Sequence, residues 1–356
     1  MSKITARELA KRLNLSPSAV SLALNGREGV SEETRARVLS AARTLGYQPP
    51  RLRMPEAASE CFNICIIYFI DFRVNLLPHS TLASYILQGI EATAEHLGCR
   101  TAIAYVNADR PIAPQAASIL DNADGVILLG TDIVEANLPI ARTLVKQLSQ
   151  VPIVVVDNLL LSDQADCICN DNVSGARMAI EHLLSQGCRT IGYLRCMPRV
   201  QAIKIREDSF KAAMAQHGLT LAPIVDLLPF SGKSFSQFEA WLQANPSLPD
   251  AFVADHDELA IAAMQALNSR GISIPNQVAL VGFDDSDAGR MMVPPLSSVH
   301  TFRQSLGSAA ISCLHQRLRF GSNTAVARQN GLLSVSISTQ LKIRDSSLRM
   351  PRQRNK

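Results

Sequence analysis

Several signatures of metal binding and membrane insertion are absent from this sequence. The eight cysteines, at positions 61, 65, 99, 167, 169, 188, 196 and 313, contain no C-x-x-C pair, so neither a zinc site nor a disulfide framework is predicted. The longest strongly apolar run, Ile64–Ile70, is far shorter than a segment that spans a bilayer. The N-terminus lacks the apolar core of a signal peptide. We therefore expect a cytoplasmic protein with no membrane partner.

Motifs of the common α/β enzymes are also missing. The stretch from Ser231 to Ser234 resembles the end of a phosphate-binding loop, but the first Gly of that motif falls on Leu227. The sequence has no G-x-G-x-x-G fingerprint near a strand and no H-E-x-x-H. We therefore expect no enzymatic activity, no cofactor and no metal, with a sugar-active α/β enzyme as a disfavoured alternative.

Acidic residues are scarce at the start of the chain. Residues 1–55 hold ten Lys or Arg against four Asp or Glu, whereas residues 56–341 hold nineteen against twenty-six. The net charge of +4 for the whole chain therefore conceals a basic N-terminal segment on an acidic body. Positive charge concentrated in this way indicates binding to nucleic acid phosphates.

This basic segment contains the pattern of three short helices. Thr5 and Glu8 form a capping box before the first helix, and Asn14 can adopt the left-handed conformation that ends it. Ser16-Pro17 starts the second helix after about three residues, the spacing of a helix-turn-helix. Ser31 caps the third helix. An ordinary helical bundle has the same pattern, but the charge favours DNA binding.

Residues 4–49 resemble the head of the lac repressor and purine repressor (LacI/GalR) family. The shared motifs are Ala19-Val20-Ser21, Leu24-Asn25-Gly26, Val30-Ser31-Glu32-Glu33-Thr34-Arg35 and Leu45-Gly46-Tyr47-Gln48-Pro49. The resemblance implies that the major groove receives Pro17, Ser18 and Leu22. It implies that backbone phosphates or the turn are held by Ser16, Ser21, Asn25, Ser31 and Thr34. The predicted DNA-binding set is completed by Thr5, Arg51 and Leu52.

Two positions depart from this family. Position 22 is usually Arg, and Leu22 can make only an apolar contact where Arg would bind guanine, so we expect a different operator. The linker reads Pro50-Arg51-Leu52-Arg53-Met54-Pro55-Glu56, with Glu56 where the family has a Leu that wedges into the minor groove. We expect either less bending of the operator or a wedge made by Leu52.

The remaining 280 or so residues alternate between short apolar runs and amphipathic stretches, a pattern typical of parallel βαβ units. Predicted strands are Asn63–Phe69, Thr101–Val106, Gly125–Leu129, Ile153–Val156, Thr190–Leu194, Ile224–Leu227, Ala251–Val253 and Val278–Val281. This body resembles the family's effector-binding core, which is related to periplasmic sugar-binding proteins. The matching motifs include Val151-Pro152-Ile153-Val154-Val155-Val156-Asp157-Asn158 and Val281-Gly282-Phe283-Asp284-Asp285.

The predicted fold is thus an N-terminal all-α helix-turn-helix head on a two-lobed, periplasmic-binding-protein-like α/β core. The head covers residues 1–48, the hinge linker 49–61 and the core 62–340. The first lobe would hold residues of about 62–158 and 298–325, and the second about 162–294 and 326–343. The chain would cross between lobes three times, as the family implies. Residues 344–356 are polar and basic, and we expect a disordered tail.

Charged residues that follow strands mark a candidate ligand site, because ligands of open α/β sheets bind at the carboxyl ends of strands. Asp157 and Asp284 directly follow predicted strands, and Asp257 lies just after another. The resemblance assigns effector contacts to these aspartates and to Arg206, and Phe230 could cover a ring. Carboxylates and a guanidinium suit a sugar or a similar polar metabolite. Alternatively, such aspartates cap the next helix.

The sequence therefore predicts a DNA-binding transcriptional regulator, expected to repress, that reads a palindromic operator as a homodimer. A small polar effector between the lobes, expected to be a sugar, would shift operator affinity. A nucleobase or another non-sugar effector is the alternative. A periplasmic binding protein would match the core but not the head.

Overall fold

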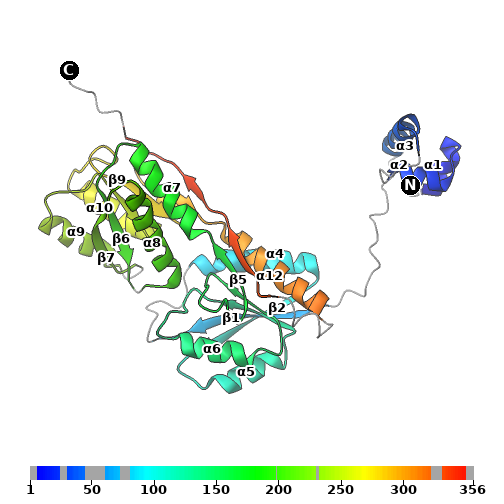
Figure 1. Cartoon of the computed structure of the whole chain (residues 1–356), viewed down its shortest axis with the longest axis horizontal. Coiled ribbons are helices and arrows are strands. Elements are labelled where there is room, and N and C mark those ends of the chain that lie inside the picture. The colour runs from blue at the N-terminus through cyan, green and yellow to red at the C-terminus, as the bar shows by residue number, and fades with distance from the viewer. Residues whose placement is uncertain are drawn as a thin grey trace. The chain divides into compact units, whose positions relative to one another are not determined.

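The computed structural model describes residues 6–24, 30–44, 61–72, 81–197, 199–229, 232–321 and 331–349. The chain divides into two units, Met1–Glu60 and Cys61–Lys356, drawn in Figure 1. Among the described helices, none combines the length and apolar character needed to cross a membrane.

The head contains three helices, α1 (Ala6–Leu13), α2 (Pro17–Leu24) and α3 (Glu32–Thr44). Their inner faces bury a small apolar cluster made of Leu9, Ala10, Val20, Ala23 and Val38. Asn14 has a φ of 55°, the left-handed conformation predicted for the residue that ends the first helix. The short turn between α1 and α2 confirms the helix-turn-helix.

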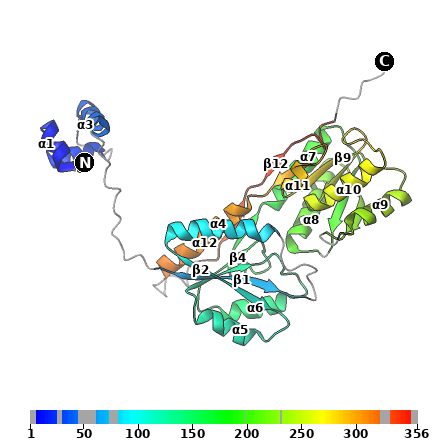
Figure 2. The same cartoon turned by 180° about the vertical axis from the view of Figure 1, so that it is seen from behind.

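The first lobe is a parallel six-stranded sheet between two layers of helices. Its strands occur in the order β11-β5-β4-β3-β1-β2. They are β1 (Asn63–Ile70), β2 (Arg100–Asn107), β3 (Gly125–Leu129), β4 (Ile153–Val156), β5 (Asp166–Asn170) and β11 (Ser334–Ile337). The helices are α4 (Thr81–Leu97), α5 (Ile112–Leu120), α6 (Leu138–Gln147) and α12 (Arg303–Gly321). Figures 1 and 2 show α4 and α12 on one face and α5 and α6 on the other.

Alternation along the central strand explains these layers, because successive side chains of a strand point to opposite faces. On β1, Ile64 and Ile66 pack in the cluster that includes residues of α4 and α12. Cys65, Ile67 and Phe69 pack in the cluster that includes residues of α5 and α6. Both faces are apolar, as expected of a parallel sheet covered on both sides.

The second lobe has the same architecture. Its sheet has the order β12-β10-β9-β8-β6-β7, and only the pairing of β10 with β12 is antiparallel among the described strands. The strands are β6 (Ile191–Cys196), β7 (Leu221–Leu227), β8 (Ala251–Ala254), β9 (Ala279–Phe283), β10 (Ser297–His300) and β12 (Gln340–Lys342). The helices are α7 (Asn172–Ser185), α8 (Gln201–Gln216), α9 (Ser234–Ala244), α10 (Asp257–Ser269) and α11 (Asp287–Arg290).

The described chain passes between the lobes three times, after β5, after β10 and after β11. Three crossings were expected, but their predicted positions were wrong. β5 and β11 belong to the first sheet, although residues from 162 and from 326 were assigned to the second lobe. β10 belongs to the second sheet, although residues from 298 were assigned to the first. Pairing between strands distant in sequence sets these boundaries, for example Val335 with Ile168.

The expectation of disorder from residue 344 is wrong for residues 344–349. Ser346 and Ser347 are fully buried. The Ser346 hydroxyl donates to the carbonyl of Leu280 at 2.7 Å, and Ser347 Oγ lies 2.7 Å from Nε2 of His182. Polar composition therefore concealed a segment whose hydroxyls bind the second lobe. Residues 350–356 lie outside the described residues.

Candidate functional site

The exposed start of α2 is the first candidate site. Ser16 Oγ accepts a hydrogen bond from the Ala19 amide at 3.1 Å, which caps the helix as predicted. Ser16, Pro17 and Ser18 are exposed, and Leu22 is partly exposed one turn further on. Ser31 caps α3 through the Thr34 amide at 3.2 Å. The arrangement presents short polar side chains at an exposed helix N-terminus, which favours negative groups.

Several predicted DNA-binding residues cannot be placed. Thr5, Asn25, Arg51 and Leu52 lie outside the described residues, and so does the side chain of Ser21. Their contacts with DNA stay predictions.

The second candidate site is the cleft between the two lobes. Asp157 follows β4 of the first lobe, and Asp284 follows β9 of the second. Both have positive φ, 62° and 107°, which is uncommon for residues other than Gly and often marks functional positions. A cavity of about 40 Å³ is lined by both aspartates together with Arg206, His256 and Arg303. A neighbouring cavity of about 200 Å³ shares Asp157, Asn170 and Ala202 with it.

Three cationic groups converge on Asp284. Oδ1 lies 2.9 Å from Nη2 of Arg303 and 3.8 Å from Nη2 of Arg206, and Oδ2 lies 2.9 Å from Nδ1 of His256. Burial alone would raise the pKa of Asp284, but these neighbouring charges lower it well below its usual value. Asp284 is therefore ionised at neutral pH.

His256 is protonated by the same contact. Burial alone would lower the pKa of His256, but the hydrogen bond to Asp284 and its charge raise the pKa to about 10. His256 immediately precedes α10, so the positive end of that helix also faces this part of the second lobe.

Arg206 is held rigidly in the cleft from α8. Its Nε donates to Oδ1 of Asn172 at 2.8 Å and its Nη1 donates to the carbonyl of Asp255 at 2.6 Å. The guanidinium also lies over the ring of Phe283, 3.8 Å from the centroid, a cation–π contact. The structure thus brings Arg206 to Asp284 and Asp157, as expected.

Asp157 lines the same cavity from the first lobe. Burial raises the pKa of its carboxyl to about 6, although Arg206 and Arg303 act in the opposite direction. Its Oδ1 is buried without a hydrogen-bond partner in the part of the chain that the structure describes, and so is Oδ1 of Asn170. Two buried acceptors without donors suit a ligand that carries hydroxyl or amino groups.

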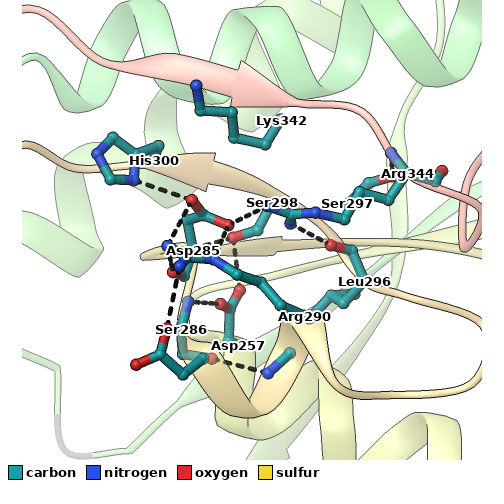
Figure 3. A network of polar contacts seen from close by, with 12 residues as sticks. Asp257, Asp285, Ser286, Arg290, Leu296, Ser297, Ser298, His300, Lys342 and Arg344 are labelled. Atoms are coloured by element: carbon teal, nitrogen blue, oxygen red, sulfur yellow. Dashed lines mark hydrogen bonds and ion pairs between the residues drawn. The ribbon is translucent and has the colours of Figure 1, made fainter.

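Asp257 does not join this cluster. Its Oδ1 accepts from Ser298 Oγ at 2.6 Å, and its Oδ2 accepts from the Ser286 amide at 2.6 Å. Figure 3 shows the side chain turned toward these serines, beside the network around Asp285. Asp257 lies at the start of α10 and supports the loop after β9. This structural role resembles the alternative interpretation, in which a strand-end aspartate caps the next helix. Phe230, the predicted ring contact, lies outside the described residues.

Sequence reasoning missed His256, Arg303 and Asn170 as lining residues. His256 lies between Asp255 and Asp257 just after β8, and this place after a strand could have marked it. Arg303 gave no local signal, because it opens α12 immediately after the chain returns to the first lobe. Asn170 ends β5, a strand that was not predicted.

Comparisons with known proteins match the head and the core separately. Residues 5–50 match bacterial regulatory proteins, lacI family, and residues 180–347 match a periplasmic binding protein-like domain. The chain is 27% identical to the HTH-type transcriptional regulator GalR of Lacticaseibacillus casei, over 97% of this chain and 99% of the relative. It is 25% identical to the ribose operon repressor of Escherichia coli strain K12, over 88% and 93%.

Among solved structures, the lac repressor dimer bound to operator and the anti-inducer ONPF is similar in fold. It has a TM-score of 0.67 and 20% identity, and the match covers 98% of this chain and 100% of that chain.

A helix-turn-helix head followed by a two-lobed, periplasmic-binding-protein-like core defines a DNA-binding transcriptional regulator. The sequence relatives are transcriptional regulators rather than enzymes, which excludes the enzyme alternative. The chain therefore combines the head of the lacI family of bacterial regulatory proteins with a periplasmic binding protein-like domain.

Proposed function

We propose that this regulator is a repressor that binds a palindromic operator as a homodimer. Its affinity for the operator falls or rises when a small polar metabolite, expected to be a sugar or a similar compound, binds between the lobes. The carrying observation is the cleft in which Asp157 of the first lobe faces Arg206 and Asp284 of the second. Because residues of both lobes form the site, binding of a ligand there would depend on how the two lobes are oriented.

The head supplies the contacts with DNA. Backbone phosphates or the turn would be held by Ser16, Ser21, Asn25, Ser31 and Thr34, and Thr5 would also contact the DNA. Pro17, Ser18 and Leu22 would enter the major groove, and Arg51 and Leu52 would contact the DNA from the linker. Phosphate contacts position such a head, whereas contacts to base edges select the sequence.

A homodimer follows from the use of two heads on a symmetric site. The similar lac repressor structure is a dimer bound to its operator, which supports this assembly. Binding to operator DNA also places the protein in the cytoplasm.

Three contacts already join the lobes around the cleft. The first is the ion pair between Arg303 and Asp284. Lys204 Nζ lies 2.6 Å from Oε1 of Glu135, and Gln201 Oε1 accepts from the Leu159 amide. A ligand that favours this arrangement would shift the population toward it, and a coupling of roughly 1 to 3 kcal/mol changes operator affinity about five- to 150-fold.

The test is retardation in a gel of a palindromic fragment taken from upstream of the gene itself. We expect a specific complex whose affinity falls steeply as salt rises, because phosphate contacts release counterions. The double variant Ser16→Ala, Ser18→Ala should weaken the complex. Absence of any complex at low salt would contradict the proposed function.

A further inference from the structure

The cavity that contains Asp284 gathers three cationic side chains in its lining. Oδ1 of Asp284 forms ion pairs with Arg206 and Arg303, and Oδ2 forms one with His256. Asp284 therefore holds these three side chains close together.

One of these cations, Arg303, retains a donor that the described residues do not satisfy. The contact of Arg303 Nη2 with Asp284 is an ion pair without hydrogen-bond geometry, and this buried nitrogen has no other partner among the described residues. A guanidinium has five N–H donors, and a buried donor without an acceptor is costly. A ligand oxygen, most effectively a charged one, would complete the site.

The net charge of the cavity lining also favours an anionic group on the ligand. The ionisable side chains that line this cavity are three cations, Arg206, His256 and Arg303, and two carboxylates, Asp157 and Asp284. Arg303 is the first residue of α12, so the positive end of that helix adds to the field. The carboxylate of nearby Asp255 is turned away, since its two oxygens accept from Tyr193 and from the amide of Cys196.

Two other residues of the lining require donors instead. Asp157 and Asn170 each hold one buried Oδ1 without a partner among the described residues. Both residues also line the larger neighbouring cavity of about 200 Å³. Hydroxyl groups satisfy such acceptors. The cations and these acceptors together favour a ligand with an anionic group and a polyhydroxylated chain.

We propose that the effector is a polyhydroxylated monocarboxylate, a sugar acid, with its carboxylate against Arg303 and His256 and its hydroxyls against Asp157 and Asn170. The assignment rests on the proposed function and specifies the ligand class of its cleft. One negative charge balances the excess of one cation in the lining. A neutral sugar can offer Arg303 only a hydroxyl oxygen and leaves the excess positive charge of the lining unbalanced, whereas a phosphate dianion exceeds that positive charge.

The test is isothermal titration calorimetry of the full-length protein with matched pairs. Gluconate, galactonate and mannonate are each compared with glucitol, galactitol and mannitol, which share their stereocentres and lack only the carboxylate, and glucose 6-phosphate is added. We expect at least one acid to bind, with its alditol roughly 10- to 100-fold weaker, the value of a charge-assisted hydrogen bond. Equal binding of the alditol, tighter binding of the phosphate, or no binding by any acid would overturn the inference.

Two variants on the same helix locate the contact. Arg303→Gln should weaken acid binding roughly 10- to 100-fold, whereas Arg319→Gln, an exposed position on α12, should change it less than about twofold. Operator retardation without ligand reports that Arg303→Gln is folded. Equal losses in both variants would contradict the assigned carboxylate contact.

Ligand binding and operator binding, measured on the same protein, distinguish the sugar-acid inference from the proposed function. If a neutral sugar binds and changes operator affinity, the regulator function holds and the sugar-acid inference fails. If an acid binds but no operator complex forms, the proposed function fails instead.

Discussion

Asp157 and Asp284 follow strands in different lobes, yet their surroundings shift their pKa values in opposite directions. Burial dominates at Asp157 and raises the pKa to about 6. Three nearby cations outweigh burial at Asp284 and lower the pKa. The two residues therefore have different functions in the cleft. Asp284 organises the cations, whereas Asp157 keeps an acceptor available for a ligand.

The first prediction concerns Asp157→Asn. Because burial raises the pKa of Asp157 from 3.8 to about 6, its ionisation opposes folding above pH 6 and has no effect below about pH 4. Asn also tolerates the positive φ of this position. We expect the variant to raise the free energy of unfolding by up to roughly 3 kcal/mol at pH 8 and to leave it unchanged at pH 4. Urea unfolding at both pH values measures this, and an equal change at both would contradict it.

The second prediction concerns Leu22→Arg in the head. Leu22 is partly exposed on α2 and can contact only apolar groups of a base. We expect the variant to prefer guanine at one position of each half-site, with discrimination of about 1 to 3 kcal/mol. Selection from half-sites with randomised bases measures the preference, and Leu22→Met serves as the control that keeps the original one. If Leu22→Arg and the control preferred the same base, this would contradict the prediction that residue 22 lies in the major groove.

At the scale of elements, two glycines allow α4 and α12 to touch. A Cβ on Gly89 would lie 2.0 Å from the carbonyl oxygen of Gln304, and one on Gly307 would lie 2.0 Å from that of Ile86. The backbones therefore approach too closely for any side chain. Because α12 begins with Arg303, this contact also fixes the position of a cleft residue.

The third prediction follows from that contact. Gly89→Ala should lower the free energy of unfolding by about 2 to 4 kcal/mol, because a rigid backbone carbonyl must move to admit the methyl group. Gly331→Ala is the matched control, since a Cβ there meets nothing within 4 Å, and should change stability by less than about 0.5 kcal/mol. Thermal or urea unfolding compares the two. Similar stability of both variants would show that the helices separate at little cost.

Local patterns predicted the elements that bury continuous apolar runs. β3 and β4 were predicted with their observed bounds, because each is a short run of aliphatic residues beside turn signals. β5 was missed, since Asp166 and Asn170 at its ends conceal a strand that is buried by pairing with β4 and β11. Strand-end aspartates could likewise be found from sequence, whereas the approach of Arg303 to Asp284 depends on the crossing between lobes.

At the scale of the whole molecule, the lobes meet through few polar contacts. The exposed pair of Lys204 and Glu135 joins α8 of the second lobe to the segment before α6 of the first. Hydrogen bonding to Lys204 lowers the pKa of Glu135, so the pair is ionised at neutral pH. Exposed pairs contribute little, so this pair alone would not hold the lobes together.

The fourth prediction concerns the charges of Lys204 and Glu135. Lys204→Glu should weaken effector binding about two- to fivefold, because two carboxylates then oppose approach of the lobes, while an exposed pair makes only a small contribution. The double variant Glu135→Lys, Lys204→Glu should restore the affinity. Calorimetry with the effector measures each step, and failure of the swap to restore binding would argue against a contact across the cleft.

The central claim is that occupancy of the cleft and binding of the operator are coupled. Its most direct test is fluorescence anisotropy of labelled operator titrated with the full-length protein, with and without saturating effector, for the wild type and for Arg303→Gln. We predict that effector changes the operator dissociation constant of the wild type about five- to 150-fold and that Arg303→Gln loses this change at the same effector concentration. An identical operator dissociation constant with and without bound effector in the wild type would contradict the account.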